Sequence, residues 1–248
     1  MKNNSDLHIL NKNLGESPLD CILRFRKINP EFEKVPMTYA GRLDPMAEGA
    51  LIVLSGESVH EKERYLDLPK TYVFEILWGF GTDTFDVLGM VTGENSEEPQ
   101  EAVVSQSLRT GRFEQRYPAY SSKPVQGKPL FQWAREGRLA EVEIPKHAVE
   151  IFNARFVSRR KIGKMNLLQD IISKIKTVTG DFRQEEIARS WNDAIGRSSE
   201  EKFAIDTIEM TVSSGFYVRQ FVSDFSAEFQ AKALCFHIKR TKIGEFSI

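Results

Sequence analysis

Apolar and polar positions follow two different periods along the chain, and these periods predict strands interspersed with helices. Apolar runs and runs with two-residue alternation predict strands at 7–10, 50–54, 71–80, 88–92, 149–157, 204–212 and 233–243. Helical spacing or helix-end signals predict helices at 18–29, 99–111, 128–136, 164–197 (two helices) and 216–230. The strands outnumber what a helical bundle needs, so we expect an α+β fold with a mixed sheet.

Two of these helices carry clear end signals. Ser17 is expected to be an N-cap, with Pro18 at the first helical position and Asp20 in the first turn. Gly137 is expected to be the C-cap of the helix at 128–136.

Residues 164–197 differ in character from the rest of the chain. They predict two helices, "KMNLLQDIISKIKTV" and "RQEEIARSWNDAI", separated by Gly180-Asp181. Four apolar residues recur at helical spacing and fall on one face of the first helix: Leu167, Ile171, Ile172 and Ile175.

The composition of the 248 residues, 41% hydrophobic and 28% charged, is that of an ordinary globular protein. No apolar stretch is long enough to span a membrane, and the first residues lack the apolar core of a signal peptide. We therefore expect a soluble, cytoplasmic protein without membrane contact. Cys21 and Cys235 are far apart and the four histidines are scattered, so neither a disulfide framework nor a metal site is expected.

Charge is unevenly distributed although the formal net charge is only −1. Such a net charge gives no global sign of nucleic-acid binding. An ordinary solvated surface and a basic face with an acidic back both fit the distribution, and composition favours the first. Basic residues gather at Arg155, Arg159, Arg160, Lys161 and Lys164 and at Lys239, Arg240 and Lys242; acidic ones gather at Glu94, Glu97, Glu98 and Glu101.

Asp44 stands alone in the stretch "YAGRLDPMAEGALIVL", between an Arg-Leu pair and a proline, just before the apolar run at 50–54. An isolated Leu-Asp-Pro is usually only a turn. Three further segments change that interpretation. They are Lys70-Thr71-Tyr72 with "GFGTDTFD" and Gly89; "PAYSSK" through Gly127-Lys128 to "AREG"; and "SGFYVR" with the closing "KRTKIGEFS".

Together these segments resemble the motifs of the TruB-type tRNA pseudouridine synthases, in the family's order and with compatible spacing. The loop Gly41–Leu51 is similar to G-x-L-D-P-x-A-x-G-x-L, and residues 70–89 are similar to K-x-Y followed by G-x-x-T-D-T-x-D-x-x-G. Residues 118–128 are similar to P-x-Y-S-A-x-K-x-x-G-K, and residues 214–219 to S-x-G-x-Y-I-R. The resemblance covers most of the chain except roughly 164–197.

The resemblance implies the pseudouridine synthase fold, with a mixed, largely antiparallel central sheet flanked by helices. It implies one catalytic domain over residues 1–248, with an RNA-gripping insertion at about 112–140 and a helical insertion at about 164–197. The implied reaction isomerises uridine to pseudouridine in tRNA, at uridine 55 of the T-loop. It needs no metal, nucleotide or redox cofactor. The expected partner is the T-arm of tRNA, protein partners are unknown, and we expect a monomer.

The resemblance also assigns roles to residues. Asp44 is the essential carboxylate, acting as nucleophile or as base at the ribose, two roles that sequence does not separate. Arg219 would pair with Asp44 and keep it anionic. Tyr72 would stack on the flipped base, and Tyr217 of the S-x-G-x-Y-I-R motif is assigned to substrate binding.

Departures from the family pattern leave some roles open. In the TruB family a histidine five residues before the aspartate fills the gap left by the flipped base. In this chain Tyr39 occupies that position. Arg42, directly before Leu-Asp, resembles the RNA-inserting arginine of sister families; its alternative is a buried ion pair. Lys12 matches K-P-x-G in part, because Asn13 replaces the proline, and is expected to support the site or contact RNA. Asp86 is expected to order its turn or to contact nucleotides.

The segments that bind RNA, and the activity itself, also admit more than one interpretation. The chain ends at "KIGEFSI", where many bacterial members continue into an RNA-binding domain, so the catalytic domain is expected to supply the RNA grip. The basic stretch at 158–164 and the helices after it would contact RNA, another protein, or only the rest of the fold. An RNA-binding or RNA-chaperone protein with little activity, and a synthase acting on rRNA or mRNA, are the two rival functions.

Overall fold

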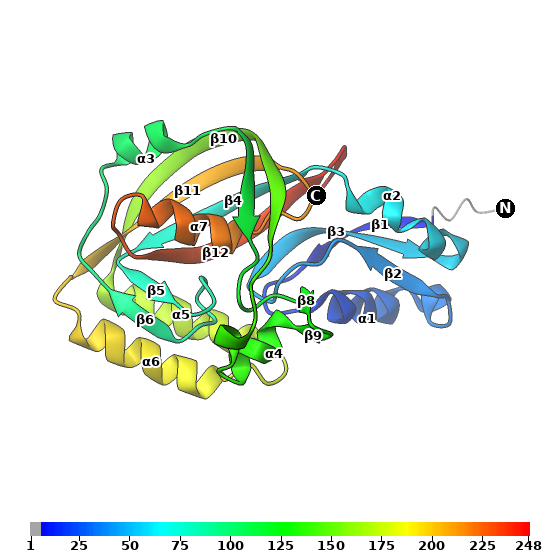
Figure 1. Cartoon of the computed structure of the whole chain (residues 1–248). Coiled ribbons are helices and arrows are strands. Elements are labelled where there is room, and N and C mark those ends of the chain that lie inside the picture. Colours follow the sequence, from blue (N-terminus) through cyan, green and yellow to red (C-terminus); the bar gives the residue numbers. More distant parts are fainter. Residues whose placement is uncertain (1–5) are drawn as a thin grey trace.

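A nine-stranded sheet forms the core of the computed structural model, which describes residues 6–248 (Figure 1). The strand order is β1-β3-β12-β4-β11-β10-β7, with β13 paired to β12 and β2 to β3. Between these strands the β3–β12 pairing is parallel and the others are antiparallel. The strands are β1 (Leu7–Lys12), β2 (Met37–Ala40), β3 (Ala47–Ser55), β4 (Lys70–Trp78), β7 (Gly111–Arg116), β10 (Lys146–Gly163), β11 (Lys202–Val212), β12 (Ala233–Ile243) and β13 (Phe246–Ser247).

Two small hairpins and seven α-helices complete the described part of the chain. The hairpins are β5 (Phe80–Thr82) with β6 (Val91–Glu94), and β8 (Pro124–Val125) with β9 (Lys128–Pro129). The helices are α1 (Pro18–Ile28), α2 (Glu63–Leu66), α3 (Glu101–Ser107), α4 (Leu130–Arg135), α5 (Lys164–Thr177), α6 (Gln184–Arg197) and α7 (Val218–Ala227). Short 3-10 helices lie at η1 (Pro30–Phe32), η2 (Gly56–Glu61) and η3 (Leu139–Glu141).

The predicted mixed, largely antiparallel sheet with flanking helices is confirmed. The strand at 233–243 has the predicted bounds, and α1 begins with a capping box in which Ser17 and Asp20 bond each other's backbone amides. Three other predictions were wrong in their bounds. Lys128 and Pro129 pair with β8 before α4 begins, α3 ends at Ser107, and the strand expected at 88–92 starts only at Val91.

Strand β10 is twice as long as predicted, and its neighbour β7 was missed entirely. Strand β7 and the two ends of β10 are mostly polar, so they lack the apolar pattern that predicted a strand at 149–157. Their pairing with each other and with β11 holds them in the sheet instead. Tertiary pairing therefore overrides a weak local signal here.

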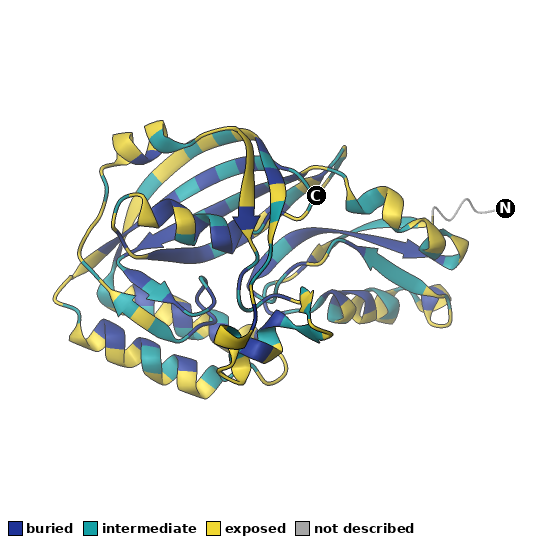
Figure 2. Ribbon diagram, viewed as in Figure 1, coloured by how far each residue is buried: buried dark blue, intermediate teal, exposed yellow. Residues whose placement is uncertain are grey.

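The two faces of the sheet are covered by different helices, because successive side chains of a strand point to opposite faces. Phe74, Ile76 and Trp78 of β4 pack in a cluster with α7, whereas Leu77 packs in the cluster that contains α5 and α6. Figure 1 shows α7 and the α5–α6 pair on opposite sides of β4, β11 and β12. The buried positions of Figure 2 are concentrated along β4, β11 and β12, between these layers, and along β3, whose side chains pack against α1 and α2.

Helices α5 and α6 and the turn between them, residues 164–197, connect β10 to β11 at the end of their hairpin, where the helical insertion was expected. The two strands remain paired up to Gly163 and Lys202, so the sheet itself would need only a short turn there. The predicted apolar face of α5 is confirmed, since Leu167, Ile171 and Ile175 are buried against the sheet.

The basic stretch at 158–164 does not form a free cationic surface. Arg159 makes a bidentate ion pair with the fully buried Asp206, with N–O distances of 2.6 and 2.7 Å. Asp206 also accepts from the Trp78 indole at 2.8 Å. Arg160 pairs with Glu75, and Lys161 pairs with Glu98. Carboxylates thus neutralise these three cations, and Arg159 has a structural role.

Replacing Arg159 by Ala should lower the free energy of unfolding by about 3 kcal/mol, because a buried carboxylate loses its charge partner. Arg155→Ala is the matched control on the same strand: its side chain is 59% exposed and pairs with Glu209. That variant should lose less than about 1 kcal/mol. Urea unfolding measures both values, and equal losses would contradict the structural role of Arg159.

Candidate active site

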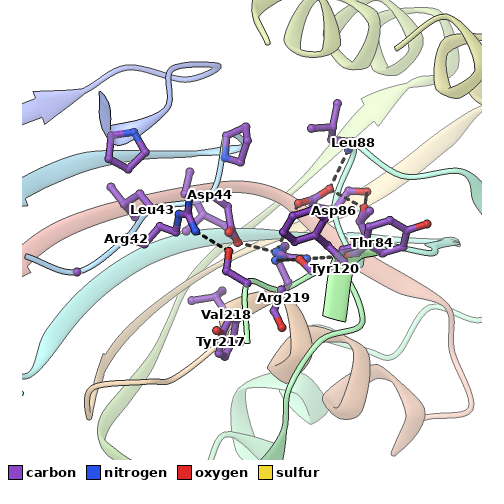
Figure 3. Close-up of a pocket in the computed structure, with 18 of the residues that line it drawn as sticks. Arg42, Leu43, Asp44, Thr84, Asp86, Leu88, Tyr120, Tyr217, Val218 and Arg219 are labelled. Atoms are coloured by element: carbon purple, nitrogen blue, oxygen red, sulfur yellow. Dashed lines mark hydrogen bonds and ion pairs between the residues drawn. The ribbon is translucent and has the colours of Figure 1, made fainter. Parts of the chain in front are cut away.

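A cavity of about 560 Å³ opens where several segments distant in sequence meet (Figure 3). Its size falls within the roughly 300–1,000 Å³ common for small-molecule sites. The β2–β3 loop, the turn after β5, the start of α7, residues 120–122 and the turn between α5 and α6 all contribute to the wall. The lining includes Arg42, Asp44, Tyr72, Tyr120, Tyr217 and Arg219.

The backbone of the Asp44 loop is held by groups beneath it. The buried Arg240 guanidinium donates to the carbonyls of Gly41, Arg42 and Ala50, over 2.8 to 3.4 Å. Lys12 donates to the carbonyl of Ala47 at 2.6 Å, and the amide of Gly15 donates to the carbonyl of Pro45 at 2.9 Å. These bonds fix the loop, so the Asp44 side chain, which is 36% exposed, enters the cavity from a rigid support.

Gly49 allows β3 to approach β12 closely just after the Asp44 loop. It pairs with Arg240, and its φ is +107°, a backbone angle that other residues rarely adopt. A Cβ at this position would lie 2.2 Å from the Arg240 carbonyl oxygen. The glycine thereby brings β12, and the Arg240 side chain on it, against the loop.

Arg219 is the centre of the hydrogen-bond network in the cavity. It is the second residue of α7, its side chain is 4% exposed, and its Nε donates to Asp44 Oδ2 at 2.8 Å. The Nη atoms donate to the carbonyls of Thr84 and Tyr120, at 2.6 and 3.3 Å. Burial alone would lower the pKa of Arg219, but the Asp44 and Asp86 carboxylates outweigh burial and raise it. The predicted pairing of Arg219 with Asp44 is therefore present.

Asp86 is the second carboxylate beside Arg219, with 3.6 Å between Oδ2 and Nε. Its Oδ1 accepts from the Thr84 hydroxyl and from the Leu88 amide, at 2.8 and 2.9 Å. Burial raises the pKa of Asp86 from 3.8 to about 6, although Arg219 acts in the opposite direction. Because this pKa lies above its ordinary value, the ionised carboxyl disfavours the folded state increasingly as the pH rises from about 4 to 6. Of the two expected roles, ordering of the turn is the one whose contacts are present.

Two tyrosines line the same cavity as the Asp44 carboxylate. Tyr72 of β4 is 8% exposed and lines the cavity, and Tyr217 precedes α7 on the same wall. Burial, reinforced by the Asp44 charge, raises the pKa of Tyr217 to about 12. Its phenol therefore stays protonated near neutral pH and can donate a hydrogen bond.

The cavity contains Arg42 but not Tyr39. Arg42 is exposed and its Nη1 donates to the Ser122 hydroxyl at 2.6 Å, so the alternative of a buried ion pair was wrong. Tyr39 packs against the cluster of Cys21, Ile22, Leu51 and Val53.

Lys12 is completely buried and bonds only backbone carbonyls in its vicinity, those of Asn13 and Ala47. Burial lowers the pKa of its amine to about 8. Of its two expected roles, support of the site fits, whereas contact with RNA does not, because no part of the side chain is accessible.

Some lining residues had no signal in the sequence. Asp181, Phe182 and Arg183 come from the helical insertion, for which no counterpart was recognised. Arg183 pairs with Asp83, one hundred positions away, and only the tertiary structure reveals such a pair. Ser121 could have been noticed as part of the "PAYSSK" motif; its hydroxyl is buried on the cavity wall without a hydrogen-bond partner among residues 6–248.

Within residues 6–248, no group of three or more His, Cys, Asp or Glu side chains is arranged to hold a metal ion. In the same range, no helix is long and apolar enough to cross a membrane.

Solved structures share this fold over 97% of the chain at low sequence identity. One is described as an H/ACA ribonucleoprotein bound to a substrate RNA containing 2′-deoxyuridine, with a TM-score of 0.54 and 13% identity. Another is a Cbf5-Nop10-Gar1 complex, with a TM-score of 0.55 and 14% identity. The chain covers 48% and 49% of those chains. The fold is thus that of the pseudouridine synthases, as the motifs predicted.

The family follows from sequence. Residues 30–175 match the model of the TruB family pseudouridylate synthases, N-terminal domain, and the chain belongs to this family. A tRNA pseudouridine synthase B of Lactobacillus johnsonii is 28% identical over 97% of this chain and 69% of its own length. One from Caldicellulosiruptor saccharolyticus is 30% identical over 60% of this chain and 51% of its own. The tRNA pseudouridine synthase 4 of Schizosaccharomyces pombe is 27% identical over 93% of this chain and 70% of its own length. The chain therefore spans between half and about 70% of these relatives.

Proposed function

We propose that this chain isomerises uridine to pseudouridine in tRNA, at uridine 55 of the T-loop. The observation that carries the proposal is the Asp44–Arg219 pair in a cavity that Tyr72 and Tyr217 also line. Membership of the TruB family and the names of its relatives support tRNA as substrate. Position 55 rests on the motif resemblance.

In the proposed reaction the bond between N1 of uracil and C1′ of the ribose breaks. The uracil turns within the cavity and forms a bond from C5 to C1′; C5 then loses its proton and N1 gains one. The Asp44 carboxylate attacks C1′ as nucleophile or takes a proton from the ribose as base, and Arg219 orients it for either role. No atom enters or leaves the nucleotide overall, so the substrate and product are isomers.

The other proposed contacts bind the flipped nucleotide. Tyr72 would stack on the uracil, and the protonated Tyr217 phenol would donate to it. The Ser121 hydroxyl, which has no partner in the described chain, is available to the same base or its ribose. Arg42 would bind the RNA around the gap that the flipped base leaves. If Arg42→Ala and Tyr39→Ala both retain the wild-type single-turnover rate, neither residue has that role.

Incubation with unmodified tRNA transcripts, followed by carbodiimide mapping of pseudouridine, tests this function. We expect one product, at position 55 of the T-loop. Tight tRNA binding without any pseudouridine would favour the RNA-chaperone alternative. Pseudouridine formed only in rRNA or mRNA fragments, and not in tRNA, would show that another RNA is the substrate. The assay needs no added metal or cofactor if the expectation from the motifs holds, so it is run with and without EDTA.

A further inference from the structure

The turn between α5 and α6 belongs to the wall of the cavity, beyond the two helices that cover the sheet. Asp181, Phe182 and Arg183 line the cavity together with Tyr120 and Arg135. Because the β10–β11 hairpin does not need the insertion for closure, the position of this turn calls for an explanation beyond chain connectivity.

The turn is held in one conformation by its own contacts. The Gln184 side chain donates to the carbonyls of Val178 and Gly180, at 3.2 and 2.6 Å, and accepts from the Phe182 amide at 2.8 Å. Arg183 has φ +62° and ψ +29°, left-handed values that are uncommon for a residue with a side chain. These bonds fix where the Phe182 and Arg183 side chains begin.

Arg183 connects the insertion to two other segments of the wall. Its Nη2 donates to Asp83 Oδ2 at 3.0 Å, and its guanidinium lies 5.0 Å from the centre of the Tyr120 ring. The Tyr120 hydroxyl donates to the same Asp83 oxygen at 3.0 Å. Arg135 donates to the Asp181 carbonyl at 2.8 Å, with its guanidinium 5.9 Å from the Phe182 ring. The turn thus ties the β5–β6 turn to the RNA-gripping insertion.

We propose that residues 180–183 form a wall of the RNA-binding cleft, in which Arg183 positions Tyr120 and neutralises Asp83 so that the polyanion can approach. This inference rests on the proposed function, because it takes RNA as the occupant of the cavity. The wall has the chemistry of a surface for unpaired nucleotides, since aromatic planes stack on bases and guanidinium groups attract phosphates. Phe131, Phe182 and Tyr120 supply the planes, and Arg135 and Arg183 the guanidinium groups.

Asp83 explains why the position needs a cation. Its Oδ1 accepts from the Met90 amide and its Oδ2 from Tyr120, so the carboxylate is required for the turn and for the tyrosine. Left without Arg183, this carboxylate, whose side chain is 22% exposed, would be uncompensated directly behind Tyr120 and would repel the phosphates of an RNA strand in the cleft. Arg183 is therefore a positioning residue that acts through Asp83 and Tyr120, and it comes from the segment without a recognised family counterpart.

Affinity for an unmodified tRNA transcript tests the inference. Arg183→Ala should raise the dissociation constant about tenfold, because an uncompensated charge then faces the RNA. Arg189→Ala is the matched control: it removes one positive charge from the same insertion, at a side chain 74% exposed and paired with Glu185. This control should bind within about twofold of the wild type.

A second substitution separates positioning from direct contact. Asp83→Asn keeps an oxygen that accepts from the Met90 amide, and its NH2 group can donate to the Tyr120 hydroxyl. The negative charge is removed, so the Asp83→Asn/Arg183→Ala double variant should bind within about threefold of the wild type. Binding is measured where circular dichroism shows each variant fully folded, and Arg183→Gln replaces Arg183→Ala if the latter does not fold.

Two results would overturn the inference. One is a tRNA affinity of Arg183→Ala equal to that of Arg189→Ala. The other is a loss of affinity in Arg183→Ala that the added Asp83→Asn substitution does not restore. The pseudouridine yield of the wild type is assayed in parallel. A wild type that binds tRNA but forms no product would refute the proposed function and leave the comparison of affinities intact.

Discussion

Replacing Asp44 by Asn should lower the single-turnover rate of pseudouridine formation by at least about 10³-fold, with little change in tRNA affinity. The amide can neither attack C1′ nor accept a proton at neutral pH, whichever role the carboxylate has. It retains the shape of the side chain and an oxygen that can accept from Arg219 Nε, which lies 2.8 Å from Asp44 Oδ2. The fold should survive because the loop backbone is held by Arg240, Lys12 and Gly15 rather than by this side chain.

The measurement is a rapid-mixing time course with enzyme in excess over labelled tRNA, together with a binding isotherm for each protein. Asp193→Asn is the control, an exposed aspartate on α6 outside the cavity lining, and it should retain the wild-type rate. A rate for Asp44→Asn within tenfold of the wild type would show that another group carries the chemistry. A loss of binding equal to the loss of rate would show that Asp44 only helps to hold RNA.

Replacing Arg219 by Met should lower the free energy of unfolding by about 3–5 kcal/mol at pH 8, because the buried Asp86 carboxylate loses its cation. The loss should be smaller at pH 5. The pKa of Asp86 is already raised to about 6, so at pH 5 its carboxyl is mostly protonated and needs no cation, whereas at pH 8 it is ionised. Pseudouridine formation should also be lost, because among residues 6–248 only Arg219 bonds the Asp44 carboxylate.

Urea unfolding at both pH values measures this dependence, and two further variants identify its source. Asp86→Asn in the Arg219→Met background should remove most of the difference between pH 5 and pH 8. Arg219→Lys keeps the charge but lacks the planar fork that reaches the carbonyls of Thr84 and Tyr120, so it should recover only part of the stability. Equal losses for Arg219→Met at the two pH values would contradict the role given to Asp86.

Much of the central sheet was predictable because its strands carry strong local patterns. The strand at 233–243 is recognised by its apolar content. In the same way, the α1 capping box depends only on residues close together in the sequence. The polar strands β7 and β10 were missed or shortened, because cross-strand pairing rather than apolar alternation holds them. The role of Arg159 was not predictable for the same reason. The sequence indicates a surface cation, and only the pairing of β10 with β11 places Asp206 next to it.

The candidate site divides in the same way. Motif order alone brought together Asp44, Tyr72, Tyr217 and Arg219, and the cavity contains all four. Lys12, in contrast, is buried under the loop, and Tyr39 packs in the apolar cluster beside α1, so neither lines the cavity. A sequence motif gives the order of residues along the chain. Whether a side chain is buried depends on which distant segments pack over it.

By itself the sequence determined most of the central strands and longer helices, the family and the residues that carry the proposed chemistry, because each is encoded in short runs with a strong local signal. Only the tertiary structure decided that Asp86 shares Arg219 with Asp44, and that the helical insertion reaches the cavity through Arg183. Those contacts join residues separated by about one hundred positions or more, and their strength depends on desolvation in a common pocket. No local pattern encodes such a separation, because the distance between two side chains is fixed only when the sheet is assembled.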